Sequence, residues 1–190
     1  MDLSFSETQI QYVETVRKLV KNEITPHILE LEKAHHFPWA IINKAWEMGV
    51  INLSIPESVK GFDIDIFTTA LIIQEISYGD TGISTSAMCN DLANVVISQH
   101  GTDEQKERFL RPFVEKPLLA SFCLTEPGAG SDNSLMTSFI AKRDDGTYVL
   151  NGAKCFITNA SYASQFTVPC KVGKHASNFM ACVVIPVEPV

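Results

Sequence analysis

The sequence lacks several features that mark specialised classes of protein. No apolar run approaches the roughly 20 residues of a membrane-spanning helix, so no membrane span is predicted. The N-terminus, MDLSFSETQI, has no charged-then-apolar signal pattern, so nothing marks secretion. Positive charge is in deficit, because 15 Lys and Arg face 22 Asp and Glu, a net charge of −7. Bulk nucleic-acid binding, which usually needs a basic face, is therefore not expected.

Paired cysteines are also missing. The chain has five cysteines, an odd number, and no two are spaced as CxxC. This pattern argues against a disulfide framework or a zinc site and predicts reduced thiols in an intracellular compartment. His35 and His36 are adjacent, whereas two metal ligands on one helix face need i, i+4 spacing. We expect a surface turn at this pair and no metal site.

The chain is 45% hydrophobic with a mean hydropathy of +0.07, so it has enough apolar residues to form a substantial core. The pattern of apolar residues along the chain changes near residue 117. Residues 1–116 show helical periodicity, and residues 117–190 show short runs rich in β-branched and aromatic residues. The sequence therefore predicts an α+β fold, with an all-helical N-terminal domain (1–116) followed by an antiparallel β domain (117–190).

Local signals place the helix ends. Ser4 or Ser6 can cap the first helix. The run IFTTALIIQEISY, residues 66–78, predicts an apolar helix, and Gly101 is the expected stop of the helix after it. Thr102 is then the expected cap of a short charged helix.

The second half is punctuated by turn residues. Asp144-Asp145-Gly146 and Asn151-Gly152 are hairpin signals, because both tolerate positive φ. The segment NGAKCFITNA, residues 151–160, is then expected to be a strand that presents Phe156 and Thr158 on one face. An aromatic ring beside a hydroxyl there can stack on a flat ligand and bond its polar edge, although a half-buried hairpin explains the same pattern.

The segment CLTEPGAGSD, residues 123–132, predicts a strand that runs into a loop with exposed backbone. Gly128 and Gly130 allow main-chain N–H groups to approach a ligand, and Thr125 and Ser131 add hydroxyls. The loop lacks the GxGxxG spacing of a dinucleotide-binding turn and the Lys of a P-loop. A plain tight turn remains an alternative from these residues alone.

Together, CLTEPGAGSD and NGAKCFITNA resemble the acyl-CoA dehydrogenase family, and KAWEMGVINLSIPE and HGTDEQKERFLRPF resemble segments of its helical domain. The resemblance covers essentially all 190 residues and is nearest to the medium-chain enzymes. It implies a helical domain, a middle β domain that is incomplete here, and a C-terminal helical bundle that is absent from this chain.

The resemblance also implies FAD as cofactor and assigns residues to it. Phe122, Leu124 and Thr125 border the flavin ring, with Thr125 on its pyrimidine side. The remaining cofactor contacts that it implies are Gly130, Ser131, Phe156, Ile157 and Thr158. Ser131 also reaches the acyl-CoA, as does Ser177. By the same resemblance Met88 and Cys89 are candidates to line the acyl tunnel, although ordinary helix core explains both residues.

The family's reaction oxidises a fatty acyl-CoA to the trans-2-enoyl-CoA and passes electrons to an electron-transferring flavoprotein. The resemblance thus implies a homo-oligomeric flavoprotein oxidoreductase of fatty acid β-oxidation and lipid metabolism. It also implies a location in the mitochondrion, in the matrix, for a eukaryotic protein, or in the cytoplasm for a bacterial one. The family's catalytic Glu lies in the C-terminal bundle, so no base is assigned here, and Glu126 is expected to be structural.

Two departures keep alternatives open. The loop ESVKGFDID is more polar than the glycine-richer loop of many relatives. The chain stops after IPVEPV, directly after an expected strand. A truncated, catalytically inactive relative that acts as a binding or assembly subunit is the alternative to an enzyme. A flavin oxidase of the same fold is a third possibility, because the motifs do not fix the electron acceptor.

Overall fold

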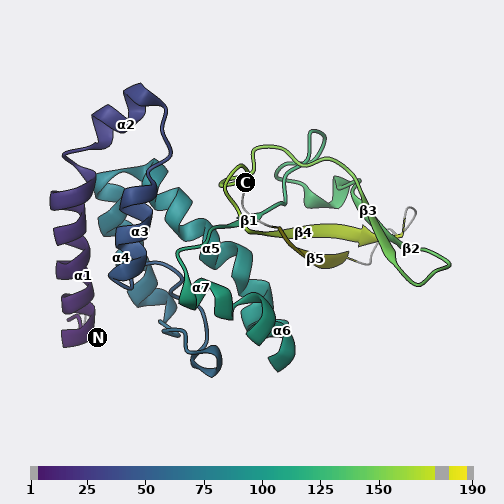
Figure 1. Ribbon diagram of the computed structural model, residues 1–190, viewed down its shortest axis with the longest axis horizontal. Coiled ribbons are helices and arrows are strands. Elements are labelled where there is room, and N and C mark those ends of the chain that lie inside the picture. The colour runs from purple at the N-terminus through teal and green to yellow at the C-terminus, as the bar shows by residue number, and fades with distance from the viewer. Residues whose placement is uncertain (1–3, 174–179, 188–190) are drawn as a thin grey trace. The chain divides into compact units, whose positions relative to one another are not determined.

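The computed structural model describes residues 4–173 and 180–187 (Figure 1). The chain divides into two compact units, the first ending at Leu118 and the second beginning at Leu119. The predicted α+β class, with a helical part followed by a sheet, is confirmed.

The first unit is helical. Its α-helices are α1 (Glu7–Leu19), α2 (Ile28–Ala34), α3 (Trp39–Glu47), α4 (Ile66–Gly79), α5 (Thr81–His100), α6 (Asp103–Phe109) and α7 (Arg111–Glu115). A π-helical turn, Val20–Ile24, extends α1, and a 3₁₀ turn, Glu57–Val59, precedes α4. Proline cannot supply the N–H that a helix interior needs, and the helical path breaks around Pro26 before α2 begins.

Side-chain caps explain where these helices start. The hydroxyls of Ser6 and Thr102 accept hydrogen bonds from the N–H groups three residues on, and both sites form full capping boxes. Asp65 and Asp80 cap α4 and α5 in the same way. The predicted cap at Thr102 and stop at Gly101 are confirmed, and of the two candidate caps for α1 the structure selects Ser6.

The core of the first unit lies where α1 packs along α4, and α4 in turn packs along α5 (Figure 1). Val16 and Leu19 of α1 and Ile72 and Ile76 of α4 are almost completely buried. Their spacing of three and four residues places them on one face of each helix, as burial of an apolar stripe requires.

The second unit is built on one five-stranded sheet. Its strands are β1 (Ala120–Phe122), β2 (Phe139–Lys142), β3 (Tyr148–Asn151), β4 (Gln165–Val172) and β5 (Met180–Pro186). β4 is central: β1 pairs with its beginning and β2 with its end, while β5 pairs along its whole length. A short 3₁₀ turn, Asn133–Leu135, lies between β1 and β2.

The sheet is mixed, so the expectation of an antiparallel β domain is wrong in this respect. β2–β3 and β4–β5 are antiparallel, but β1 and β2 both run parallel to β4. The hairpin predicted at Asp144-Asp145-Gly146 is present, with Gly146 at φ 85°. The parallel pairs are β1–β4 and β2–β4, and the chain between the partners, residues 123–164 and 143–164, is long enough for parallel pairing.

The predicted strand at residues 151–160 is also wrong beyond Asn151, where β3 ends. The chain leaves the sheet at Gly152, and residues 152–164 are turns and irregular backbone. Phe156 and Asn159 have φ values of 56° and 64°, in the left-handed region that no strand uses. Asn151-Gly152 is therefore not a hairpin turn.

Candidate functional site

Two segments that carry predicted cofactor residues meet in the second unit. We call residues 123–132 the signature loop and residues 154–159 the arch. The Cys155 N–H donates to the Thr125 carbonyl at 3.0 Å. At the other end of the arch, the Ser121 hydroxyl donates to the Thr158 carbonyl at 2.7 Å. The arch is thus held at both ends against β1 and its continuation.

The middle of the arch faces solvent. Phe156 lies between the two attachments and is 93% exposed. An aromatic residue with φ near 56° is uncommon, because its Cβ crowds the backbone in the left-handed region. Ile157 and Thr158 beside it are half-buried. An exposed aromatic ring in a strained backbone conformation is the kind of feature that binding sites contain.

The signature loop leaves β1 and turns tightly. Glu126 and Ala129 exchange two backbone hydrogen bonds, of 3.0 and 3.1 Å, around Pro127 and Gly128. A Cβ atom built at Gly128 would meet nothing within 4 Å, and the same holds at Gly130. Neither glycine has a left-handed φ, so neither the fold nor the backbone of this chain requires glycine there. The open space permits close approach of a ligand to the backbone.

Two hydroxyls of this loop are available to a ligand. Thr125 is half-buried and Ser131 is exposed. Among the contacts of the described residues, neither hydroxyl has a hydrogen-bond partner, unlike that of Thr137. Open space at two glycines, two available hydroxyls and an exposed aromatic ring together fit a flat, polar-edged group with an anionic tail, as FAD is.

Glu126 is the most heavily bonded side chain of the signature loop. It is 4% exposed, and its carboxylate accepts from the Thr137 N–H and hydroxyl at 2.7 Å each and from the Ser138 N–H at 3.0 Å. The Lys154 Nζ adds a fourth bond at 2.9 Å. Burial alone raises the pKa of this carboxyl, but the bonds from Ser138, Lys154 and Thr137 outweigh it and hold the pKa well below its usual range. The Glu126 carboxylate is therefore ionised, and its hydrogen-bonding capacity is filled by these four bonds.

Lys154 completes this arrangement from the arch. Its ammonium donates to the Leu124 carbonyl at 3.0 Å as well as to Glu126. The side chains of Lys154 and Glu126 are 11% and 2% exposed, so the pair is largely shielded from water. The sequence analysis missed Lys154 and Ser121, and the local signal for Lys154 was a charged residue beside the apolar residues 155–157.

The remaining predicted site residues are placed as follows. Phe122 ends β1, Leu124 continues it, and both are half-buried. Met88 lies on α5 in the first unit and is half-buried, next to the buried Cys89. Ser177 lies outside the described residues. The roles of all these residues stay predictions.

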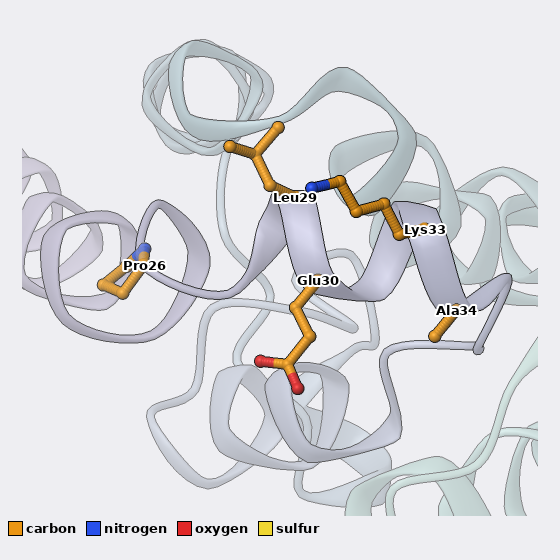
Figure 2. A pocket seen from close by; sticks show the side chains of 5 residues that line it. All are labelled: Pro26, Leu29, Glu30, Lys33 and Ala34. Atoms are coloured by element: carbon orange, nitrogen blue, oxygen red, sulfur yellow. The ribbon is translucent and has the colours of Figure 1, made fainter.

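Other features of the described residues add no site of this kind. A surface hollow on α2 is lined by Pro26, Leu29, Glu30, Lys33 and Ala34 (Figure 2). It contains none of the predicted cofactor residues. Within residues 4–173 and 180–187, no group of His, Cys, Asp or Glu is arranged to hold a metal ion. Over the same residues, no helix combines the length and apolar character that crossing a membrane requires.

Comparisons with known proteins point to one family. Residues 6–116 match the model described as the acyl-CoA dehydrogenase N-terminal domain, and residues 121–189 match the middle domain. A Caenorhabditis briggsae protein named "Probable medium-chain specific acyl-CoA dehydrogenase 2, mitochondrial" is 34% identical over 169 residues, which are 88% of this chain and 41% of that relative.

Solved structures agree. Butyryl-CoA dehydrogenase from Megasphaera elsdenii superposes with a TM-score of 0.90 at 29% identity, over 98% of this chain and 50% of that one. An acyl-CoA dehydrogenase complexed with FAD from Bacillus anthracis superposes with a TM-score of 0.87 at 28% identity, over 96% and 31%. The chain thus spans half or less of the length of these relatives.

Proposed function

This chain belongs to the acyl-CoA dehydrogenase family, and we propose that it is part of an FAD-dependent oxidoreductase that converts a fatty acyl-CoA into the trans-2-enoyl-CoA. The observation that carries the proposal is the joining of the signature loop to the arch through the Cys155–Thr125 hydrogen bond. This bond brings Thr125 and the Phe156–Thr158 segment to one place in the second unit, although the two are far apart in sequence.

FAD is the cofactor, and when bound it supplies the acceptor for the two electrons that leave the substrate. The available Thr125 hydroxyl would bond the polar edge of its ring, and the exposed Phe156 would pack on the ring and exclude water. Ile157 and Thr158 would continue that surface. Gly130 and Ser131 would present a backbone amide and a hydroxyl to its phosphate-bearing part.

The acyl-CoA ester is the proposed substrate. Ser131 would serve it as well as the cofactor, and Ser177 and Met88 are the other proposed contacts. Glu126 is excluded as the base that removes a proton from the substrate, because four hydrogen bonds already occupy its carboxylate. Its part is to keep the signature loop in shape. We assign no base within this chain.

The proposed electron acceptor is an electron-transferring flavoprotein, and the proposed assembly is a homo-oligomer. The relatives include a protein named as mitochondrial and proteins from bacteria. A mitochondrial matrix location in a eukaryote, or a cytoplasmic one in a bacterium, is the corresponding proposal, with fatty acid β-oxidation as the process.

The direct test mixes the purified protein that contains this chain, loaded with FAD, with a saturated acyl-CoA in the absence of oxygen. The proposal predicts bleaching of the flavin absorption and formation of the 2-enoyl-CoA. Rapid recovery of the flavin spectrum when air is admitted would instead indicate an oxidase. A folded protein that binds neither FAD nor acyl-CoA would contradict the proposal and favour an inactive binding subunit.

A further inference from the structure

Residues 133–153 separate the two segments of the candidate site in the sequence, and none of the described strand pairings joins the segments. Their relative position therefore depends on individual hydrogen bonds. Besides the Cys155–Thr125 bond, the Lys154 ammonium joins the arch to the signature loop through two bonds, at 3.0 Å from Leu124 O and 2.9 Å from Glu126 Oε1.

Lys154 can fix the backbone position of both the signature loop and the arch. Leu124 and Thr125 are adjacent in the signature loop, and the Lys154 bond to the Leu124 carbonyl fixes the residue just before the available Thr125 hydroxyl. On the arch, Lys154 immediately precedes Cys155, and Phe156 follows. One ammonium group thus links the backbone of one predicted cofactor segment to the start of the other.

Glu126 anchors this link to the sheet. Its carboxylate accepts from both Thr137 and Ser138, which lead into β2. Lys154, Glu126 and Thr137 therefore form a continuous chain of contacts from the arch, through the signature loop, to the start of a strand. A displacement of the arch would disrupt both Lys154 bonds.

Stability alone is a weak explanation for such a pair. Desolvation of two buried charges offsets most of their attraction, and well-packed apolar residues of the same volume stabilise a fold equally well or better. What an apolar pair lacks is direction: the ammonium bonds a specified carbonyl and a specified carboxylate oxygen at fixed distances. The arrangement therefore specifies geometry.

We propose that the Glu126–Lys154 pair is a positioning pair that holds the signature loop and the arch at the spacing that cofactor binding needs. The inference rests on the proposed function for its purpose, but the spacing itself is measurable without a cofactor. Neither residue touches the reacting atoms, and both act through the segments that they join.

The test compares Lys154→Met with Lys142→Met in the protein that contains this chain. Lys142 is an exposed lysine of β2, so its variant removes the same charge from the same unit. Because Lys154→Met leaves a buried, unpaired Glu126, a second variant, Glu126→Gln/Lys154→Met, removes both charges and so avoids the unpaired charge, while it still lacks the bond to Leu124. Lys154→Arg restores a charged donor.

Two readouts are measured: hydrogen exchange of the Cys155 amide, and FAD affinity from flavin fluorescence. The double variant is expected to lose Cys155 protection while the β2–β3 amides stay protected, and to bind FAD about tenfold more weakly or worse. Lys142→Met is expected to match the wild type in both, and Lys154→Arg to recover part of each loss.

Wild-type Cys155 protection in the double variant would overturn the inference, and so would unchanged FAD affinity. If the wild-type protein that contains this chain binds no FAD, the proposed function fails, and the exchange of Cys155 alone decides whether the pair holds the spacing. Equal loss of protection in the β2–β3 amides would also overturn the inference, because it would mean that the pair supports the whole unit.

Discussion

The Ser121 hydroxyl donates a 2.7 Å hydrogen bond to the carbonyl of Thr158, 37 residues later in the chain. Ser121 lies on β1 and is completely buried, and Thr158 is the last predicted cofactor residue of the arch. This bond fixes the far end of the arch in the absence of strand pairing. The structure thus uses a side chain of the sheet to hold a segment that is not part of it.

Ser121→Ala is expected to lower the free energy of unfolding of the second unit by about 1–2 kcal/mol, because the hydrogen bond from the buried Ser121 hydroxyl to the half-buried Thr158 is lost. Amide hydrogen exchange of β4 measures this loss. Ser161→Ala is the control, since Ser161 is exposed on the neighbouring turn, and its effect is expected to stay within about 0.5 kcal/mol. Equal effects of the two variants would show that the Ser121 bond contributes nothing.

Gly130→Ala and Gly152→Ala are expected to have different effects on the free energy of unfolding. A methyl group at Gly130 meets nothing and φ is not left-handed, so the free energy of unfolding is expected to stay the same or rise by up to about 1 kcal/mol. At Gly152 the new methyl would collide with the Ser138 side chain, at a φ of 145° that disfavours any side chain. A loss of about 2 kcal/mol or more is expected there.

Gly130→Ala also tests the proposed FAD site. Gly130→Ala is expected to weaken FAD binding although the fold is intact, because the methyl group occupies the space left for a ligand. Isothermal titration of the folded variant with FAD measures this. FAD affinity equal to that of the wild type would remove Gly130 from the proposed site.

Thr125→Val removes a hydroxyl that has no partner among the described residues and keeps the shape of the side chain. Stability is expected to change little, and FAD affinity to fall about three- to tenfold, which corresponds to one hydrogen bond. Thr147→Val is the matched control, because the Thr147 hydroxyl bonds Asp145 in the β2–β3 turn. It is expected to cost some stability and no FAD affinity. Unchanged FAD affinity in Thr125→Val, with a loss of affinity in Thr147→Val, would contradict a flavin contact at Thr125.

The pH dependence of stability follows from Glu126. Its pKa in the folded chain is lowered from the ordinary value of 4.5, because hydrogen bonds from Ser138, Lys154 and Thr137 outweigh the opposing effect of burial. A lowered folded-state pKa means that the stabilisation is present above pH 4.5 and is lost as the pH falls toward the folded-state value.

Urea unfolding between pH 4.5 and about pH 3 tests this sign. The stability of the wild type is expected to fall more steeply with decreasing pH than that of Glu126→Gln, which has no proton to gain at this position. The other carboxyl groups are common to both proteins, so the difference in slope belongs to Glu126. Parallel slopes would contradict the depressed pKa.

Local signals in the sequence predicted the local parts of the fold. Ser6 and Thr102 cap their helices because capping involves residues three apart, and the turn at Gly146 needs only its own φ. The parallel pairing of β1 with β4 involves strands far apart in the chain, and no local pattern specifies it. An antiparallel sheet was therefore the expectation from hairpin signals alone.

The arch was misread for a related physical reason. The β-branched and aromatic residues around Phe156 are typical of a strand, but the side chains of Ser121 and Lys154 bond this segment outside the sheet. The resemblance implies that Thr125 and Phe156 contact one cofactor, and that assignment stays a prediction. The residues that fix their spacing are recognisable only in three dimensions, because Lys154 and Glu126 are 28 residues apart.

Titration of the purified protein that contains this chain with FAD, followed by its visible absorption spectrum, tests the central claim most directly. The account predicts that the flavin bands shift on mixing, that flavin and protein elute together from a sizing column, and that Gly130→Ala weakens both effects. A folded chain of the correct mass whose flavin spectrum stays that of free FAD would contradict the account.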